Sequence, residues 1–231
     1  MHPTMFRKRA AAARPETRAA LSRFRLRAEF SVLFLVVPAA QLFFFGTLGA
    51  IAPLAAVFVV SALLLAVTPG FRWIEILDFR GIGRHVPLIV AAIAACAIVT
   101  FGLTFLLIPE RLLSFPLYNP ERFALVIALY PFLSVLGQEI AYRLLFFRRY
   151  RVLFPNDTTA IIASAFVFAL AHGFFANWVA IVLSFAGGLA FAWAYVRTSS
   201  FPLVWILHSL AGQVLFASGL GIFFYHGAIP G

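Results

Sequence analysis

Four ionisable side chains lie within stretches of sequence that are otherwise apolar. Glu139 and Arg143 share one stretch, His172 lies in the next and His208 in a third, with Gln138 directly before Glu139. A charged group near the centre of a bilayer costs at least about 2.5–3.5 kcal/mol on insertion scales. Carboxylates and imidazoles are residue types that transfer protons. The sequence therefore predicts a polar site inside a membrane, where a carboxylate and a neutral histidine could hold and deprotonate a water molecule.

The composition is that of a protein that crosses a membrane several times. Of the 231 residues, 63% are hydrophobic and only 11% are charged, whereas soluble domains average about 25% charged residues. The single cysteine, Cys96, excludes an intrachain disulfide. We expect one transmembrane domain over residues 30–231.

The positive charge is concentrated at the amino terminus. The net charge is +10, and eight of the 18 lysines and arginines lie in the first 27 residues. We predict that residues 1–29 form a cytoplasmic arm that fixes the topology and touches anionic lipid, rather than a nucleic-acid-binding segment. An Arg- and Ala-rich segment poor in acids also resembles an organelle transit peptide, which stays an alternative. The expected location is the bacterial inner membrane.

Apolar runs predict an all-α polytopic bundle of seven transmembrane spans. About 20 apolar residues cross a bilayer, and such runs lie at about residues 30–46, 51–67, 86–108, 123–147, 158–175, 178–195 and 201–217. The tail, residues 218–231, is apolar enough to be interfacial or a short eighth helix. With the amino terminus in the cytoplasm, fifteen of the 18 basic residues fall inside and two outside. This asymmetry favours seven spans and a carboxyl terminus outside.

Three polar clusters, each on its own span, together resemble a known family. They read Gln138-Glu139-x-x-x-Arg143, Phe168-x-x-x-His172 and His208-x-x-x-Gly212. The order is similar to the Glu-Glu-x-x-x-Arg, Phe-x-x-x-His and His-x-x-x-Asn motifs of the CAAX-protease and bacteriocin-processing family of intramembrane endopeptidases, which includes the Ras-converting CAAX endopeptidase. The resemblance covers about residues 123–221. It implies hydrolysis of a peptide bond in a membrane-associated substrate, by a glutamate-type mechanism without a cofactor.

Two positions depart from the family pattern. Gln138 replaces the glutamate usually assigned as general base, and Gly212 replaces the asparagine usually assigned to oxyanion binding. Glu139, one residue later, could be the base, with His172 holding the water. Gln138 and His208 could then donate hydrogen bonds to the developing oxyanion.

The remaining site residues have supporting roles in this hypothesis. Arg143, one turn after Glu139, would orient that carboxylate or keep it ionised. Gly212 would leave room for a substrate backbone or a water, and Gln213 faces too far from His208 to replace the family's asparagine. Phe168 and Tyr142 are expected to contact substrate.

Three alternatives stay open at this point. The two departures are compatible with a catalytically inactive scaffold that binds membrane peptides. Buried Glu, Arg and His also mark ion pathways, so a small transporter or proton relay is a third class. One carboxylate and two histidines could bind zinc with an open position, although no metal is expected. The expected partners are membrane lipid and a peptide or protein with a membrane-associated segment, and no nucleic acid.

Overall fold

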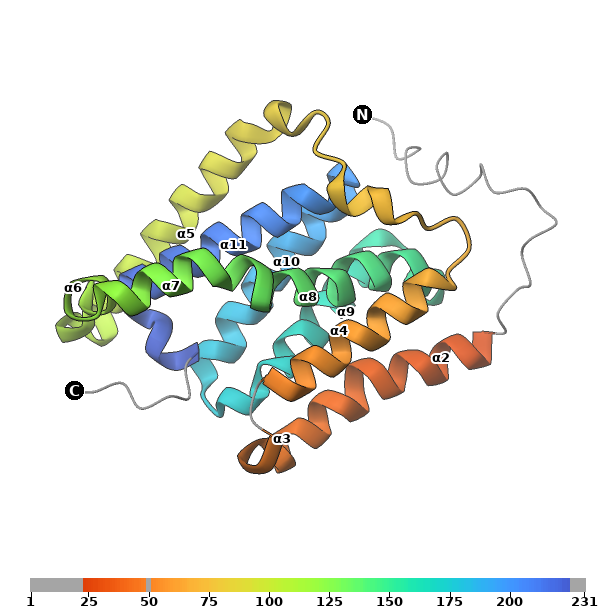
Figure 1. The fold of residues 1–231 in the computed structure, drawn as a ribbon, viewed down its shortest axis with the longest axis horizontal. Coiled ribbons are helices and arrows are strands. Elements are labelled where there is room, and N and C mark those ends of the chain that lie inside the picture. The colour runs from red at the N-terminus through yellow and green to blue at the C-terminus, as the bar shows by residue number, and fades with distance from the viewer. Residues whose placement is uncertain (1–22, 49–50, 225–231) are drawn as a thin grey trace.

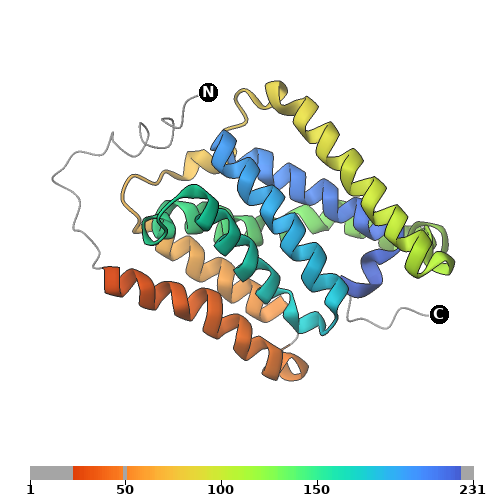
Figure 2. The same ribbon diagram turned by 180° about the vertical axis from the view of Figure 1, so that it is seen from behind.

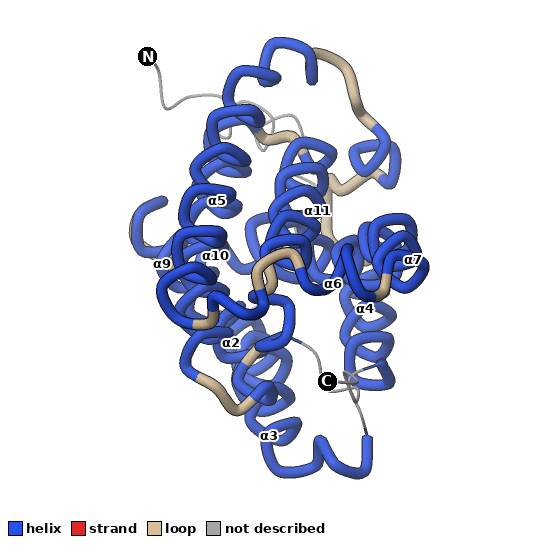
Figure 3. Tube along the Cα trace, turned by 90° about the vertical axis from the view of Figure 1, so that its left-hand side faces the viewer, coloured by secondary structure: helices blue, strands red, loops and turns tan. Residues whose placement is uncertain are grey.

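The computed structural model describes residues 23–48 and 51–224, and over these ranges the protein is a bundle of helices joined by short loops (Figures 1–3). No strand occurs within the described ranges. Most of the predicted basic arm, residues 1–22, lies outside them. The prediction of an all-α membrane bundle is confirmed at this level, since six helices are long and apolar enough to cross a membrane.

The long helices follow the predicted spans closely. They are α2 and α3 (Arg23–Ser31 and Val37–Leu48, joined by a π-helical turn at Val32–Val36), α4 (Ile51–Ala66), α5 (Val86–Leu107), α9 (Asp157–Ala171), α10 (Trp178–Thr198) and α11 (Phe201–Ser218). The fourth predicted span is one long helix made of α7 (Pro120–Tyr130), a π-helical turn (Pro131–Val135), α8 (Leu136–Glu139) and a π-helical stretch (Ile140–Tyr150). Of the seven, α4 is the shorter apolar helix, and it returns antiparallel to α2 and α3 (Figure 1).

Short elements fill the connections. A five-residue helix, α6 (Ser114–Tyr118), precedes α7. Single 3₁₀ turns lie at Trp73–Leu77, Ile82–His85, Pro109–Arg111, Arg151–Leu153, Gly173–Phe175 and Leu220–Phe224. The last of these is the only part of the predicted tail beyond α11 that the structure describes as helical, and residues 225–231 lie outside the described ranges. A glycine is needed before it: Gly219 has φ +113°, and a Cβ there would lie 2.3 Å from the carbonyl oxygen of Arg111.

The first helix begins earlier than predicted. Its described part starts at Arg23, whereas the apolar run starts near Phe30. The extra turns are charged, and Arg25 donates to Glu29 at 2.8 Å, one turn along the helix. Glu29 in turn accepts from Arg149. Hydropathy alone misses these turns because they are charged, and the Glu29–Arg149 pair that packs them against the bundle is not visible in the sequence.

Many large apolar side chains face outward, whereas the ionisable side chains of the candidate site are buried among the helices. Phe43, Ile98 and Leu133 are 83%, 75% and 70% exposed, whereas Glu139 and Arg143 are fully buried. Helix α5 packs along α11 and turns most of its apolar surface outward (Figures 1 and 2). The exposed apolar surface is therefore the surface that lipid would cover.

The basic helix ends gather at one end of the bundle. Arg148 pairs with Glu75 of the loop after α4. Arg149 pairs with Glu29 of α2, and it also donates to Thr68, just after α4, at 3.2 Å. Segments that the topology prediction places on the cytoplasmic side thus lie together in space.

Capping side chains fix where the three carboxyl-terminal helices begin. Asn156 and Thr159 form a capping box at the start of α9. Asn177 accepts from the Ala180 N–H at the start of α10, and Ser200 accepts from the Leu203 N–H at the start of α11. Such caps satisfy backbone donors that a helix leaves open. They set the positions of His172, at the end of α9, and His208, in α11.

Candidate active site

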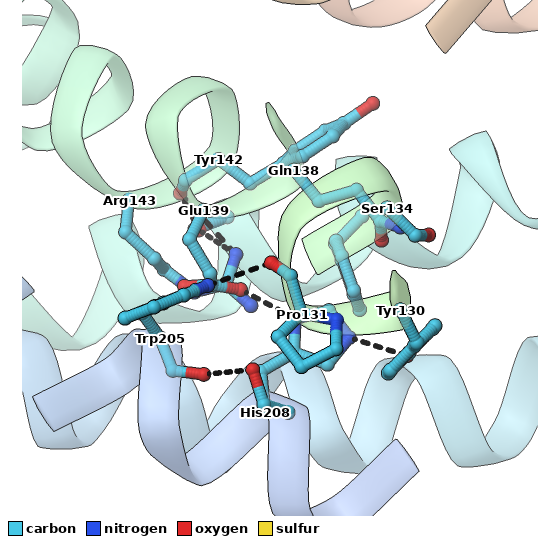
Figure 4. Close-up of polar contacts among 12 residues, drawn as sticks. Tyr130, Pro131, Ser134, Gln138, Glu139, Tyr142, Arg143, Trp205 and His208 are labelled. Carbon is cyan, nitrogen blue, oxygen red and sulfur yellow. Dashed lines mark hydrogen bonds and ion pairs between the residues drawn. The ribbon is translucent and has the colours of Figure 1, made fainter. Parts of the chain in front are cut away.

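The centre of the site is a hydrogen bond between two helices that are far apart in the sequence. His208 Nδ1 lies 2.8 Å from Glu139 Oε1. Both side chains are buried, and Glu139 is fully so. On the other side of the carboxylate, Arg143 Nε lies 3.4 Å from Glu139 Oε2. Figure 4 shows Glu139 pointing toward both partners, so the fold brings three of the predicted catalytic residues together.

Arg143 is a fully buried cation with few hydrogen-bond partners. Its Nη1 donates to the Tyr142 carbonyl at 3.3 Å and to Ser164 Oγ at 3.5 Å. Its Nε and Nη2, and also Glu139 Oε2, make no hydrogen bond of good geometry. The guanidinium carbon instead lies 4.7 Å from the ring centroid of Phe168 and 5.7 Å from that of Phe191. Aromatic faces attract a cation, so these rings compensate part of the missing hydrogen bonding.

Helix α11 clamps a kink in the long helix beside the site. Pro131 has no N–H, so the carbonyl of Ile127 loses its intrahelical donor. That carbonyl accepts from Gln213 Nε2 at 2.9 Å, and the carbonyl of Pro131 accepts from Trp205 Nε1 at 2.7 Å (Figure 4). Gln213, considered in the sequence as a substitute for the family's asparagine, thus has a structural partner. The two clamps flank His208 along α11.

A tyrosine that the sequence analysis did not single out completes the group. The Tyr130 hydroxyl lies 3.3 Å from His208 Nε2, on the opposite side of the imidazole from Glu139. Gly212 leaves the space that this phenol fills, because a Cβ at Gly212 would lie 2.4 Å from the Tyr130 hydroxyl oxygen. In the sequence, Tyr130 is marked only by its place directly before the internal Pro131. No sequence pattern links it to position 212.

His172 reaches the site through aromatic contacts. Its Nδ1 donates to the Phe168 carbonyl at 2.8 Å, which leaves its Nε2 as the unprotonated nitrogen. The Phe168 ring lies 4.5 Å from the His172 ring and 5.5 Å from the His208 ring, centroid to centroid. Phe191 stacks on the His208 ring, with the ring centroids 4.7 Å apart. Phe168 therefore contacts both histidines, and no hydrogen bond joins His172 directly to Glu139 or His208.

Gln138 and Tyr142 point away from the Glu139–His208 pair (Figure 4). Gln138 Nε2 donates to Ser134 Oγ at 2.8 Å on its own helix, and its Oε1 is buried without a hydrogen bond. Tyr142 is 5% exposed and packs against Phe34 and Phe168, with centroids at 5.5 and 5.3 Å. The substrate-contact roles predicted for Tyr142 and Phe168 stay predictions, since both rings are buried in this conformation.

The predicted residues do not form a metal-binding group here. Among residues 23–48 and 51–224, no set of three His, Cys, Asp or Glu side chains is arranged to hold a metal ion. Glu139 and His208 form a hydrogen-bonded pair, whereas His172 contacts the Phe168 ring rather than either member of that pair.

Comparison with known proteins adds one match. Residues 120–214 match the model of the family described as type II CAAX prenyl endopeptidase Rce1-like. The match confirms the resemblance to the CAAX-protease family. It covers α7 through most of α11, which are the helices that carry the site. Neither the curated proteins nor the solved structures gave a match. The apolar helices support a multi-pass membrane protein, and over residues 120–214 this protein is similar to the CAAX-type intramembrane proteases.

Proposed function

We propose that the chain is an intramembrane endopeptidase that hydrolyses a peptide bond of a membrane-associated substrate with water activated by Glu139 and the histidines. The observation that carries the proposal is the 2.8 Å hydrogen bond between Glu139 and His208, buried among apolar helices. A buried charge needs compensating partners. A carboxylate held against an imidazole is an arrangement that transfers protons.

The contacts of the carboxylate support a relay rather than direct proton uptake by Glu139. An ionised carboxylate only accepts hydrogen bonds, so His208 Nδ1 carries the proton and Nε2 carries the lone pair. Glu139 Oε1 is occupied by that bond, and Oε2 faces Arg143. In the proposed relay, His208 Nε2 takes the proton from water. Glu139 orients the ring and stabilises the imidazolium that forms.

The proposed reaction then runs in two steps. The water oxygen bonds to the scissile carbonyl carbon while the water proton moves to His208 Nε2. The C–N bond breaks next, and His208 returns this proton to the departing amine nitrogen. We propose that His172, whose Nδ1–H is held by the Phe168 carbonyl, uses its free Nε2 to position the water. No metal takes part in these steps.

Proteolysis in reconstituted vesicles tests this function. The family name points to prenylated substrates, so one probe is a quenched fluorogenic peptide ending in a farnesylated C-a-a-X sequence. The second probe is an unprenylated peptide with an apolar helical segment. Cleavage with one new amino terminus, abolished in Glu139→Gln and retained with 1,10-phenanthroline, is the expected result.

The same assay separates the alternatives. Binding of a probe without cleavage by the wild type, and cleavage only after Gln138→Glu, would favour the inactive scaffold. Loss of cleavage with 1,10-phenanthroline and its return with zinc would favour a metalloenzyme. Proton flux through the vesicles without any cleavage would favour the transporter class.

We also propose that the gathered basic end faces the bacterial cytoplasm, with the amino terminus on that side. The support is the uneven distribution of basic residues across the loops and the ion pairs that hold these segments together. Single cysteines placed near Arg151 and Arg111, in a Cys96→Ala background, should be labelled by an impermeant reagent from outside only near Arg111. The reverse labelling would invert the topology.

A further inference from the structure

The reaction proposed above places negative charge on the substrate oxygen, and this charge needs a hydrogen-bond donor near His208 Nε2. Oxyanion donors lie about 2.7–3.1 Å from the charged oxygen and account for much of the rate enhancement in acyl transfer. The donor must stand on the Nε2 side of the imidazole, because the water is deprotonated there. Arg143 is on the opposite side, beyond Glu139.

Most neutral donors near His208 are already committed to other acceptors. Gln138 Nε2 donates to Ser134, and Gln213 Nε2 donates to the carbonyl of Ile127. The indole N–H of Trp205 donates to the Pro131 carbonyl, and Ser209 Oγ donates to the Trp205 carbonyl at 2.6 Å. The bonds of Trp205 and Gln213 join α11 to the long helix, and those of Gln138 and Ser209 lie within one helix. None of these donors is free for a substrate oxygen.

The Tyr130 hydroxyl is the exception. Among the described residues, its hydrogen-bond partner is His208 Nε2 alone, at 3.3 Å, longer than the roughly 2.7–2.8 Å of a typical hydroxyl hydrogen bond. The nitrogen it contacts is the one that the proposed reaction protonates. Once Nε2 carries a proton it no longer accepts, so the hydroxyl must find another acceptor. The oxyanion forms beside Nε2 at that same moment.

The position of Tyr130 is fixed by α11 on several sides. The kink clamps of Trp205 and Gln213 hold the residues around Pro131. The phenol ring lies 5.4 Å from the Phe216 ring, centroid to centroid. A side chain at position 212 would collide with the phenol, since a Cβ there lies 2.4 Å from both the hydroxyl oxygen and Cε1. Gly212 and Tyr130 are therefore a matched pair, in which the glycine makes room for the hydroxyl.

We propose that the Tyr130 hydroxyl is the oxyanion donor of this chain, placed by the missing side chain at Gly212. The assignment rests on the proposed peptide hydrolysis. In the resting state the hydroxyl donates to His208 Nε2. As Nε2 takes the water proton, the hydroxyl turns its O–H to the substrate oxygen, and it turns back when the carbonyl re-forms. Tyr130 keeps its own proton throughout.

A set of variants tests this assignment with the peptide assay in vesicles. Tyr130→Phe keeps the ring and removes only the hydroxyl, so kcat should fall on the order of 10²–10³-fold with little change in KM. Tyr118→Phe, at a tyrosine that is 78% exposed, is the matched control and should keep wild-type activity. Tyr130→Ala/Gly212→Asn puts a short amide donor into the vacated space. This double variant should recover at least tenfold over Tyr130→Ala.

A rescue of this kind separates a donor from a residue that merely holds His208 in place. A kcat for Tyr130→Phe within threefold of wild type would overturn the proposal. So would a folded double variant that is no more active than Tyr130→Ala. Gly212→Asn alone should be poorly active because the amide meets the phenol.

A binding measurement tests Tyr130 even if the wild type cleaves neither peptide. A peptidyl trifluoromethyl ketone hydrates to a tetrahedral centre, whereas the matching peptide amide does not. The wild type should bind the ketone more tightly than the amide. In Tyr130→Phe the ratio of the two affinities should fall about tenfold or more, because binding of the ketone weakens and binding of the amide does not. If Tyr130→Phe keeps the preference for the ketone, the role of Tyr130 is overturned. If the wild type cleaves neither peptide but Tyr130→Phe loses the preference, only the proposed function is overturned.

Discussion

Two carboxylate–guanidinium pairs in the described part of this protein are built differently: Glu29 and Arg149 join two helices, whereas Glu139 and Arg143 lie one turn apart on the same helix. Glu29 and Arg149 form a two-pronged pair, with Arg149 Nε and Nη2 at 2.7 and 3.0 Å from the two carboxylate oxygens. The third nitrogen, Nη1, donates to Thr68. Glu139 and Arg143 are fully buried, yet their closest atoms are 3.4 Å apart and Arg143 leaves two nitrogens without hydrogen bonds.

In the proposed mechanism, this difference separates a structural pair, Glu29–Arg149, from a pair that lies beside the reacting groups, Glu139–Arg143. In Arg149 each of the three guanidinium nitrogens has a protein partner, so this side chain fixes the geometry of the helices. Buried polar atoms without partners are rare in native proteins, and they concentrate where chemistry takes place. Glu139 makes its shorter contact, at 2.8 Å, with His208 and its longer one, at 3.4 Å, with Arg143. We call Glu29–Arg149 the outer pair and Glu139–Arg143 the inner pair. We expect the outer pair to stabilise the fold, and the inner pair to lower the free energy of unfolding while it keeps a charged group next to the imidazole of His208.

The largest expected effect is on activity, when the two glutamates are changed in the same way. Glu139→Gln removes the charge that orients His208 and compensates the imidazolium, so kcat should fall on the order of 10⁴-fold, as for other orienting carboxylates. Glu29→Gln is the matched control and should leave kcat within about threefold. The measurement is peptide cleavage in vesicles. Equal losses in the two variants would remove the distinction between the pairs.

Breaking the inner pair from the arginine side should cost stability. Arg143→Met leaves Glu139 buried without a cation, and removal of one partner of a buried pair costs about 3–5 kcal/mol. The expected result is a loss of that size in reversible unfolding by SDS in mixed micelles. Arg80→Met is the control, because Arg80 pairs with Asp78 at the surface and such pairs contribute about 0–1 kcal/mol. A loss below 1 kcal/mol for Arg143→Met would contradict the prediction.

Removing both partners at once should change the free energy of unfolding differently for the two pairs: the inner double variant should be no less stable than wild type, and the outer one less stable. Replacing a buried ion pair with neutral side chains of similar volume is often neutral or stabilising by about 1–4 kcal/mol, so Glu139→Gln/Arg143→Met should unfold at the same or higher SDS fraction than wild type. Glu29→Gln/Arg149→Met loses several charge-assisted hydrogen bonds and should unfold earlier, by about 1–3 kcal/mol. The same sign for both double variants would show that the pairs are energetically alike.

The smallest expected effect concerns Gln138, next to Glu139 in sequence but turned toward Ser134. Gln138→Ala should lower kcat by less than about tenfold, because its donor already serves Ser134 and is not directed at His208. A loss on the order of 10²–10³-fold, the size expected for an oxyanion donor, would instead support the donor role that the sequence suggested for this glutamine. Ser134→Ala, measured in parallel, shows how much of any loss comes from the helix contact alone.

The spans could be predicted from the sequence because each depends on one local property. An apolar run of sufficient length ends where charge, Pro or Gly begins, and α9, α10 and α11 start and end within a few residues of the predicted limits. The first helix was the exception. Its amino-terminal turns are charged, and only the contact between Glu29 and Arg149, 120 residues apart, shows that they pack against the bundle.

The ionisable residues of the candidate site could be named from the sequence, but the contacts between them could not. Glu139, Arg143 and His208 stand out as ionisable residues in apolar runs, and the fold brings them into contact. The sequence suggested His172 as the holder of the water, and its link to the pair runs through the Phe168 ring. Tyr130 could not be found this way, because a tyrosine is unremarkable in an apolar helix. Its place beside His208 depends on Gly212, 82 positions later, where a side chain would collide with the phenol.

The kink at Pro131 places the two partners of His208 on separate arms of one helix. Tyr130 is the last residue of the arm before the kink, and Glu139 belongs to the arm after it. A proline interrupts the backbone hydrogen bonding of a helix, and here the carbonyls of Ile127 and Pro131 accept from Gln213 and Trp205 of α11 instead. The angle between the two arms is therefore set by α11, the helix that also carries His208. A substitution at Trp205 or Gln213 would change the distance from the phenol to the imidazole without touching either ring, and Glu139, on the second arm, would keep its own contact with His208.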